Sequence, residues 1–253
     1  MNSRISSIPN NVQDQNCDAW IKLLAYIDVL AESGADEFSP AEALGPELYA
    51  QIYTLPKSIS KLKKVKKVWL YGSNLKRIPP EIGEMDSLEY FDPYTSYNLH
   101  WFPYELTHCK KLKDSRVSTR ALYGNFKNRM PFPDLKDNPV RYDGEQLKCS
   151  VCKKSIHYSN VNQMWITLKV GTDILPLLAN LCSKECELNL PTPPKFYIPY
   201  AHKGGSKQQQ PELDEMEYFR QSGNVITISN TSADETEEKE KPKFLRLIRK
   251  IWE

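Results

Sequence analysis

The sequence predicts an α/β fold. It would consist of a short solenoid of repeated strand–turn units with an N-terminal capping helix, then a small α+β module stabilised by paired cysteines, then a disordered tail. Apolar residues recur every 23 or 24 residues, as from Val65 to Leu88 and from Leu88 to Leu112. Four of the six cysteines lie in two close pairs, and from residue 203 onward the chain becomes polar and then acidic.

Composition narrows the class of protein. The chain has 253 residues and a formal net charge of +2, which gives no general case for nucleic acid or an acidic substrate. No apolar run approaches the roughly 18 residues that a membrane span needs. The first residues also lack the apolar core of a signal peptide. We therefore expect a cytoplasmic protein.

A helix is expected over residues 17–33, ahead of the repeats, and Gly34 is a suitable stop for it. Apolar residues recur there at three- and four-residue spacing, as one face of a helix requires. They are Trp20, Leu23, Leu24, Ile27, Leu30 and Ala31. Such a helix can cover the first end of a repeat stack, which otherwise exposes apolar surface.

The repeats are clearest over residues 62–85 and become less regular afterwards. Each unit is expected to be a short strand, a turn and a return segment that buries its apolar side only against its neighbours. The apolar positions are Ile52 and Leu55 in a degenerate first unit, Val65, Val68, Leu70, Leu75 and Ile78 in the next, Leu88, Phe91, Leu99 and Phe102 in the third, and Leu112, Val117 and Leu122 in the last. An ordinary α/β domain with coincidental leucines is the alternative.

Four segments carry a resemblance to a known family. They are Leu-Pro-Lys-Ser-Ile-Ser-Lys-Leu (55–62), Arg-Ile-Pro-Pro-Glu-Ile-Gly (77–83), residues 93–106 and residues 117–125. Over roughly residues 18–200 the chain resembles an uncharacterised subgroup of bacterial leucine-rich repeat proteins with few repeats and an N-terminal helix. The resemblance implies an architecture and an interaction role, and no reaction. About three and a half repeats would form a shallow arc.

Alternation along the repeat strands predicts a partner-binding surface. If Val68 and Leu70 face the core, the residues between and after them face solvent. The expected surface residues are Trp69, Tyr71, Tyr90, Asp92 and Arg116. Trp, Tyr and Arg often anchor interfaces, so we expect an unidentified protein partner here. Alternatively, a terminal segment of the same chain covers these aromatic residues.

A run of lysines lies on the return segment of the repeats. It contains Lys57, Lys61, Lys63, Lys64, Lys66 and Lys67. The run lacks interleaved aromatic residues for base stacking, so it reads first as a solvated face. Binding to nucleic acid or an anionic membrane surface is the alternative.

The paired cysteines predict a metal site. Cys149 and Cys152 have the two-residue spacing of a knuckle turn. Cys182 and Cys186 are spaced to share a helix face, with Ser183 as the N-cap. Alternating apolar residues over 163–170 predict a strand between the pairs.

This order resembles a treble-clef zinc finger, and four thiolates form a closed structural zinc site without an open catalytic position. Two alternatives remain open. Cys149 and Cys152 could be a redox pair, or His157 or His202 could replace a cysteine as a ligand.

The last part of the chain is expected to be a linker followed by a basic amphipathic helix. Its apolar face would contain Phe244, Leu247, Ile248, Ile251 and Trp252. This helix could dock on its own chain, on a partner groove or on a membrane. The predicted divisions are a disordered N-terminus (1–16), capping helix plus repeats (17–138), zinc module (139–202), flexible linker (203–240) and amphipathic helix (241–253).

The predicted function is a non-catalytic protein–protein interaction scaffold with a structural zinc and no small-molecule substrate. No phosphate-binding glycine loop, Gly-x-Ser-x-Gly or His-Glu-x-x-His motif occurs in the sequence. The first alternative is a thiol-dependent transferase or redox enzyme that uses one of the paired cysteines. The second is binding of an anionic surface or nucleic acid through the lysine run.

Overall fold

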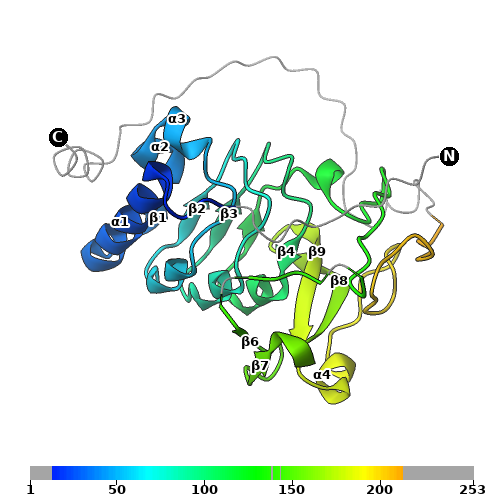
Figure 1. The fold of residues 1–253 in the computed structure, drawn as a ribbon. Helices are drawn as coiled ribbons and strands as arrows, with labels where there is room; N and C mark the ends of the chain where they lie inside the picture. The colour runs from blue at the N-terminus through cyan, green and yellow to red at the C-terminus, as the bar shows by residue number, and fades with distance from the viewer. Residues whose placement is uncertain (1–12, 138, 143, 213–253) are drawn as a thin grey trace, which may run out of the picture. The chain divides into compact units, whose positions relative to one another are not determined.

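The computed structural model describes residues 13–137, 139–142 and 144–212. Residues up to Gln210 form one unit, in which four α-helices and three small sheets are described (Figure 1). The helices are α1 (Asp18–Ser33), α2 (Pro40–Leu44), α3 (Pro46–Tyr49) and α4 (Lys184–Leu188). The strands are β1 (Glu37–Phe38), β2 (Lys67–Trp69), β3 (Tyr90–Asp92), β4 (Phe102–Pro103), β5 (Asp114–Ser115), β6 (Gln146–Lys148), β7 (Ser155–His157), β8 (Asn162–Val170) and β9 (Asp173–Leu181).

The first sheet is parallel and has the order β1-β2-β3-β5. Its register places Val68 beside Phe91 and Phe91 beside Ser115. Short 3₁₀-helices follow β1, β2 and β3 along the chain and form the opposite layer: η1 (Lys57–Lys61), η2 (Pro80–Glu84) and η3 (Tyr104–His108). Val68 and Phe91 are fully buried between these layers. Apolar burial of this kind stabilises the stack by about 25 cal/mol per Å² of area removed from water.

Glycine 83 sets the distance between two of these 3₁₀-helices. A Cβ on Gly83 would lie 2.4 Å from the backbone oxygen of Glu105. Real Cβ atoms essentially never approach backbone that closely, so η2 packs against η3 only because residue 83 has no side chain.

The second sheet is built on the long antiparallel hairpin of β8 and β9, which β4 joins by pairing in parallel with β9. The turn of the hairpin, at Gly171 and Thr172, reaches back to the parallel sheet. There the Oγ1 of Thr172 accepts from the Ser115 backbone N–H at 3.1 Å and donates to the Ser115 carbonyl at 2.8 Å. The free edge of β5 is therefore covered, and the parallel sheet ends.

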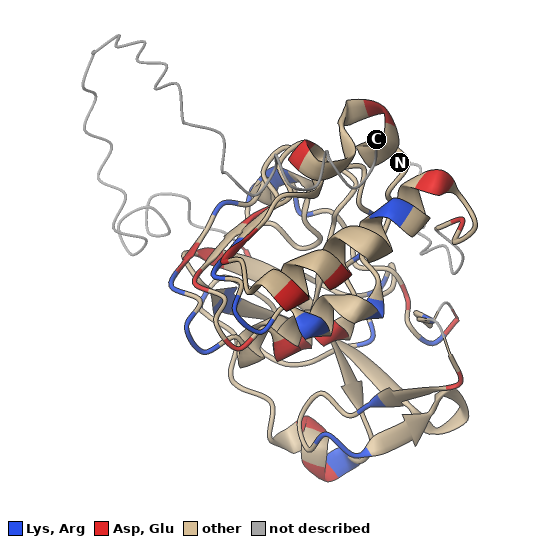
Figure 2. Cartoon of the chain, turned by 90° about the vertical axis from the view of Figure 1, so that its left-hand side faces the viewer, with Lys and Arg blue, Asp and Glu red and all other residues tan. Residues whose placement is uncertain are grey.

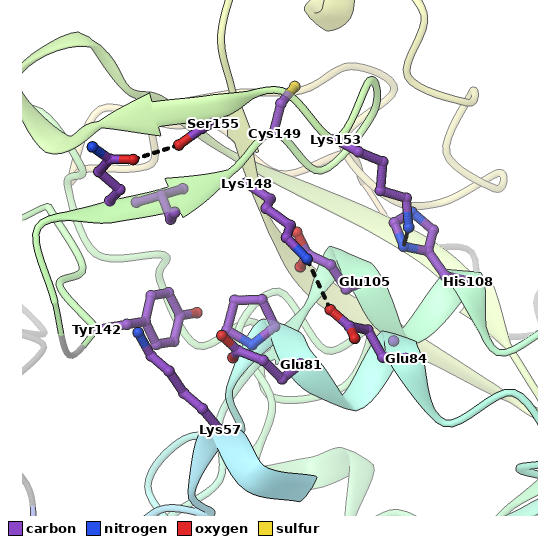
Figure 3. Close-up of a pocket in the computed structure, with 14 residues that line it drawn as sticks. Lys57, Glu81, Glu84, Glu105, His108, Tyr142, Lys148, Cys149, Lys153 and Ser155 are labelled. Carbon is purple, nitrogen blue, oxygen red and sulfur yellow. Dashed lines mark hydrogen bonds and ion pairs between the residues drawn. The ribbon is translucent and has the colours of Figure 1, made fainter. Parts of the chain in front are cut away.

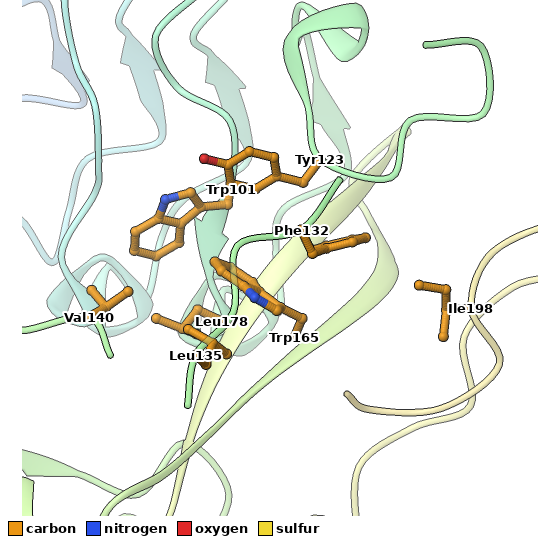
Figure 4. Packing of buried hydrophobic residues seen from close by; sticks show 8 residues of the cluster. All are labelled: Trp101, Tyr123, Phe132, Leu135, Val140, Trp165, Leu178 and Ile198. Carbon is orange, nitrogen blue, oxygen red and sulfur yellow. The ribbon is translucent and has the colours of Figure 1, made fainter. Parts of the chain in front are cut away.

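An aromatic cluster packs against the β8–β9 hairpin (Figure 4). Trp165 is fully buried at its centre, with ring centroids 5.6 Å from Trp101 and 5.7 Å from Phe132. Its indole N–H donates to the Pro133 carbonyl at 2.9 Å. The cluster joins segments that are far apart in the sequence: Trp101, Tyr123, Phe132, Leu135, Val140, Trp165, Leu178 and Ile198.

The fold class predicted from the sequence, a short leucine-rich repeat solenoid followed by a zinc-stapled module, is wrong. The described residues form a mixed α/β fold with four α-helices and several small sheets. The periodicity located the apolar positions, but it did not foresee that Phe102 and Pro103, in the return segment of the third unit, form β4 and pair with β9. It also did not foresee that the β8–β9 turn covers β5.

Several expected elements are nevertheless present. The helix expected over 17–33 is α1, which ends at Gly34 with a left-handed φ of 67°. The strand expected over 163–170 lies within β8. The linker beyond residue 212, the amphipathic helix over 241–253 and most of the N-terminal segment 1–16 lie outside the described residues. Across the described part of the chain, no helix has the length and apolar character to cross a membrane.

Candidate metal centre and candidate partner surface

The four paired cysteines converge on one point. The sulfur atoms of Cys149, Cys152, Cys182 and Cys186 all lie within 4.8 Å of one another. The closest pairs are Cys152–Cys182 at 3.4 Å and Cys182–Cys186 at 3.6 Å. Four ligands at the Zn–S distance of about 2.3 Å would place sulfur atoms about 3.8 Å apart. The spacing is therefore that of a tetrahedral metal site, and a disulfide at about 2.05 Å is absent from the cluster.

The first pair is positioned by a tight turn between β6 and β7. The backbone N–H of Cys149 donates to Lys154 at 2.8 Å, and that of Lys153 donates back to Cys149 at 2.9 Å. Lys153 takes a left-handed φ of 66°, which lets the turn close within two residues of Cys152. Backbone hydrogen bonding at Lys154 lowers the pKa of the exposed Cys152 thiol to about 7.

The second pair brackets the start of α4. Ser183 is the N-cap, and its hydroxyl accepts from the Cys186 backbone N–H at 3.3 Å, as expected from the sequence. Cys182, however, precedes the helix at the end of β9, so Cys182 and Cys186 do not share a helix face. A hydrogen bond from the Cys152 side chain raises the pKa of Cys182 to about 12.

Ser150 connects the cysteine turn to both main parts of the fold. Its backbone N–H donates to the Asn180 carbonyl at 2.7 Å, which ties the turn to β9. Its hydroxyl donates to Oε1 of Glu105 at 2.6 Å, which ties it to η3. The cysteine turn is therefore held in place by groups beyond the four sulfur atoms, as second-shell contacts at metal sites usually are.

Glu105 is expected to destabilise the protein at neutral pH. Burial raises the pKa of this carboxyl from 4.5 to about 7, Glu81 nearby raises it further, and Lys153 opposes the shift. The folded state thus holds the proton more tightly, so stability falls as the pH rises from about 4.5 to about 7. We expect Glu105→Gln to raise the free energy of unfolding by about 1–3 kcal/mol at pH 8 and by little at pH 4. Urea denaturation at both pH values measures this, and an equal change at both would contradict it.

The two histidines considered as alternative ligands lie elsewhere. His157 pairs through Nε2 with the Gln146 amide at 3.0 Å. His202 is buried against Phe132 and accepts from the Gly204 backbone N–H through Nδ1 at 3.1 Å. Among the described residues, the four cysteines are the only group of three or more Cys, His, Asp or Glu side chains with this convergence.

The residues expected to form a partner surface differ in exposure. Trp69 and Asp92 are neighbours in the register, but Asp92 is only 2% exposed. Its carboxylate accepts from the Tyr94 backbone N–H at 3.0 Å and from the Tyr90 hydroxyl at 3.3 Å, and these groups cover it, so the expectation that it is exposed is wrong. Trp69 is half-buried, with its ring 4.9 Å from that of Tyr90 and its indole N–H donating to Glu37 at 3.1 Å.

The exposed part of this surface is a stack of tyrosines on an arginine. The Arg116 guanidinium lies 4.6 Å from the ring centre of Tyr94 and 5.6 Å from that of Tyr71. Tyr71 is 54% exposed, and Tyr97, which the sequence analysis did not select, is 65% exposed. Tyr97 lies in a turn after Thr95, whose φ is 61°, and strand alternation cannot foresee such a position.

Most of the lysine run is paired with acidic side chains. Lys61 lies 2.7 Å from Asp28, Lys67 lies 2.8 Å from Glu37, and Lys63 lies 3.6 Å from Glu84. Figure 2 shows basic and acidic residues interspersed on this side of the molecule. Such exposed pairs contribute little stability, but they offset the positive charge of the run.

The geometry defines an α/β protein with a four-cysteine cluster that can hold a metal ion. Comparison with known proteins adds no family: no protein family matches the sequence, and no curated protein matches it significantly.

Proposed function

We propose that this chain is a non-catalytic scaffold that binds a protein partner in the cytoplasm and is stabilised by a structural zinc. The observation that carries the proposal is the exposed stack of Tyr71, Arg116 and Tyr94. Tyr and Arg are the residue types that most often dominate binding energy at protein interfaces, together with Trp.

The stack is preorganised for binding. Arg116 is held on one side by the two tyrosine rings and on the other by Asp92, whose Oδ2 lies 3.7 Å from the guanidinium Nε. A side chain that is already fixed loses less conformational entropy when a partner docks. The guanidinium remains half-exposed, so a partner carboxylate or backbone carbonyl can still reach its N–H groups.

The donor set of the cysteine cluster supports zinc. Four thiolates in tetrahedral spacing favour zinc or an iron–sulfur centre over the hard cations magnesium and calcium. Four protein ligands leave no open position for water or substrate, so the metal would hold the β6–β7 turn against α4 and perform no chemistry.

Partner recovery from the native host tests the binding surface. We expect the double variant Tyr71→Ala/Arg116→Ala to recover its partner at least about ten-fold less than the wild type, because hot-spot residues contribute about 2 kcal/mol or more each. Tyr200→Ala is the matched control, since Tyr200 is 56% exposed and lies in a different segment. If all three baits recover the same proteins equally, this surface is not the binding site.

A further inference from the structure

A cavity of about 440 Å³ lies between the 3₁₀-helices and the β6–β7 hairpin (Figure 3). One wall carries Glu81 from η2 and Glu105 from η3, and the opposite wall carries Tyr142 and the hairpin. We call it the Glu81–Glu105 pocket. Its volume is within the range of about 300–1,000 Å³ that is usual for small-ligand sites.

Three side chains that line it each have a buried oxygen atom without a hydrogen-bond partner among the described residues. These atoms are Oε2 of Glu81, Oε2 of Glu105 and the hydroxyl of Tyr142. Glu105 is only 8% exposed, and its other oxygen already accepts from Ser150. Each unsatisfied buried group costs about 1–3 kcal/mol, and most such groups in folded proteins have a partner. The three atoms therefore indicate a missing occupant of the cavity.

The remaining polar groups of the pocket are already engaged. Lys148 lies 3.1 Å from Glu84, and Lys153 lies 3.0 Å from Nδ1 of His108. Burial lowers the pKa of His108 to about 4, so the neutral ring accepts from this lysine. Lys57 also lines the pocket, and its charge opposes the rise in the pKa of Glu81 that burial causes. Even so, the three buried oxygens have no hydrogen-bond donor among the described residues. An alkylammonium supplies three donors and a guanidinium supplies five.

A metal ion fits the pocket less well than an organic cation. Divalent cations with oxygen ligands need several of them converging within about 2.0–2.6 Å. Among the described residues, only the four cysteines form a candidate metal cluster of three or more Cys, His, Asp or Glu side chains, and no such cluster contains Glu81 or Glu105.

The two carboxyl groups are held on a rigid frame. Glu81 and Glu105 are each the second residue of successive 3₁₀-helices. The absence of a side chain at Gly83 lets these two helices, η2 and η3, pack closely against each other. Ser58 occupies the same position in η1, and its hydroxyl is also buried without a partner. The period of 23 and 24 residues between Ser58, Glu81 and Glu105 is the sequence signal that could have revealed this column.

We propose that the Glu81–Glu105 pocket binds the cationic end of an alkylammonium or guanidinium ligand, with the two glutamates and Tyr142 receiving its N–H groups. The cation is either a free polyamine-like molecule or the lysine or arginine side chain of a protein. This site is separate from the tyrosine–arginine surface, so either proposal can fail without the other.

Isothermal titration calorimetry of the zinc-loaded full chain tests the proposal. The probes are agmatine, for a free cation, and N-acetyl-arginine amide, for a protein side chain. The neutral analogue N-acetyl-citrulline amide is the ligand control. We expect at least one cationic probe to bind with a Kd below about 1 mM, and the citrulline analogue to bind at least ten-fold more weakly. The cationic probe that binds more tightly shows whether the natural ligand is a free cation or a protein side chain.

Variants test the assignment of residues. Glu105→Gln and Glu81→Gln should each weaken cation binding at least ten-fold without lowering Tm. Glu89→Gln is the control and should leave cation binding unchanged, because Glu89 does not line the pocket and its carboxylate lies 2.7 Å from Lys113. Lys57→Met should strengthen cation binding, because Lys57 lines the same pocket and repels a second cation. If neither cation binds by calorimetry, ordered water fills the cavity. If the Lys57→Met variant binds the cationic probes more weakly than the wild type does, the natural occupant of the cavity is an anion. Either result overturns the proposal.

Discussion

Removal of the metal with a chelator is expected to lower Tm by at least about 10 °C, which corresponds to several kcal/mol for a chain of this size. Structural zinc sites contribute on the order of 10 kcal/mol to the folding of small zinc domains. We expect the β6–β7 hairpin to depend on such a site, because a two-stranded hairpin alone is marginally stable and Ile156 is the only buried apolar residue of its two strands.

A ligand variant with a matched control separates metal loss from general damage. Cys186→Ser should lose the bound zinc and reproduce the drop in Tm, whereas Cys17→Ser, outside the cluster, should keep both zinc and Tm. In the zinc-loaded wild type the four clustered thiols should resist alkylation. A stripped protein that melts at the same temperature, or one hyper-reactive thiol in the loaded protein, would argue for the thiol-enzyme alternative.

The Trp165→Ala substitution is expected to lower the free energy of unfolding by about 3–5 kcal/mol, the range for removing a large buried aromatic side chain. Trp165 contacts the rings of Trp101, Tyr123 and Phe132, all within 6 Å between centroids. The substitution would leave a cavity in the aromatic cluster against the β8–β9 hairpin and would remove the indole donor from the Pro133 carbonyl.

Guanidinium denaturation measures the change, with Trp69→Ala as the matched control. Trp69 is only half-buried and belongs to the proposed partner surface, so its removal should cost clearly less. Equal losses in the two variants would mean that the aromatic cluster contributes no more stability than the half-buried Trp69 ring.

Local features of the fold could be predicted from the sequence. The helix α1 has regular apolar spacing and a glycine at its end, and β8 alternates along its length. The cysteine cluster could be predicted because thiol spacing restricts the geometry of a metal site directly. The spacing in α1, the alternation in β8 and each cysteine pair are local signals, although 30 residues separate Cys152 from Cys182.

Long-range features could not be predicted. Phe102 and Pro103 match the pattern of the preceding units, yet they pair with Leu177 and Leu178 of β9. Nothing local to either segment specifies the other. Strand alternation predicts toward which side of the sheet the Asp92 side chain points, and for this reason Asp92 was expected on the surface. Its burial depends instead on the segment after β3, where the Tyr94 backbone N–H donates to its carboxylate. Glu105 was missed for a similar reason, since a carboxyl group gives no sign in the sequence of being buried.

The pairing of β4 with β9 also bears on how the chain is made. Phe102 leaves the ribosome 75 residues before its partner Leu177. At about 5–20 residues per second, the backbone edge of β4 waits several seconds for that partner. During this interval the edge can pair with another nascent chain. Slower translation between the two strands therefore lengthens the period in which newly made protein is prone to aggregate.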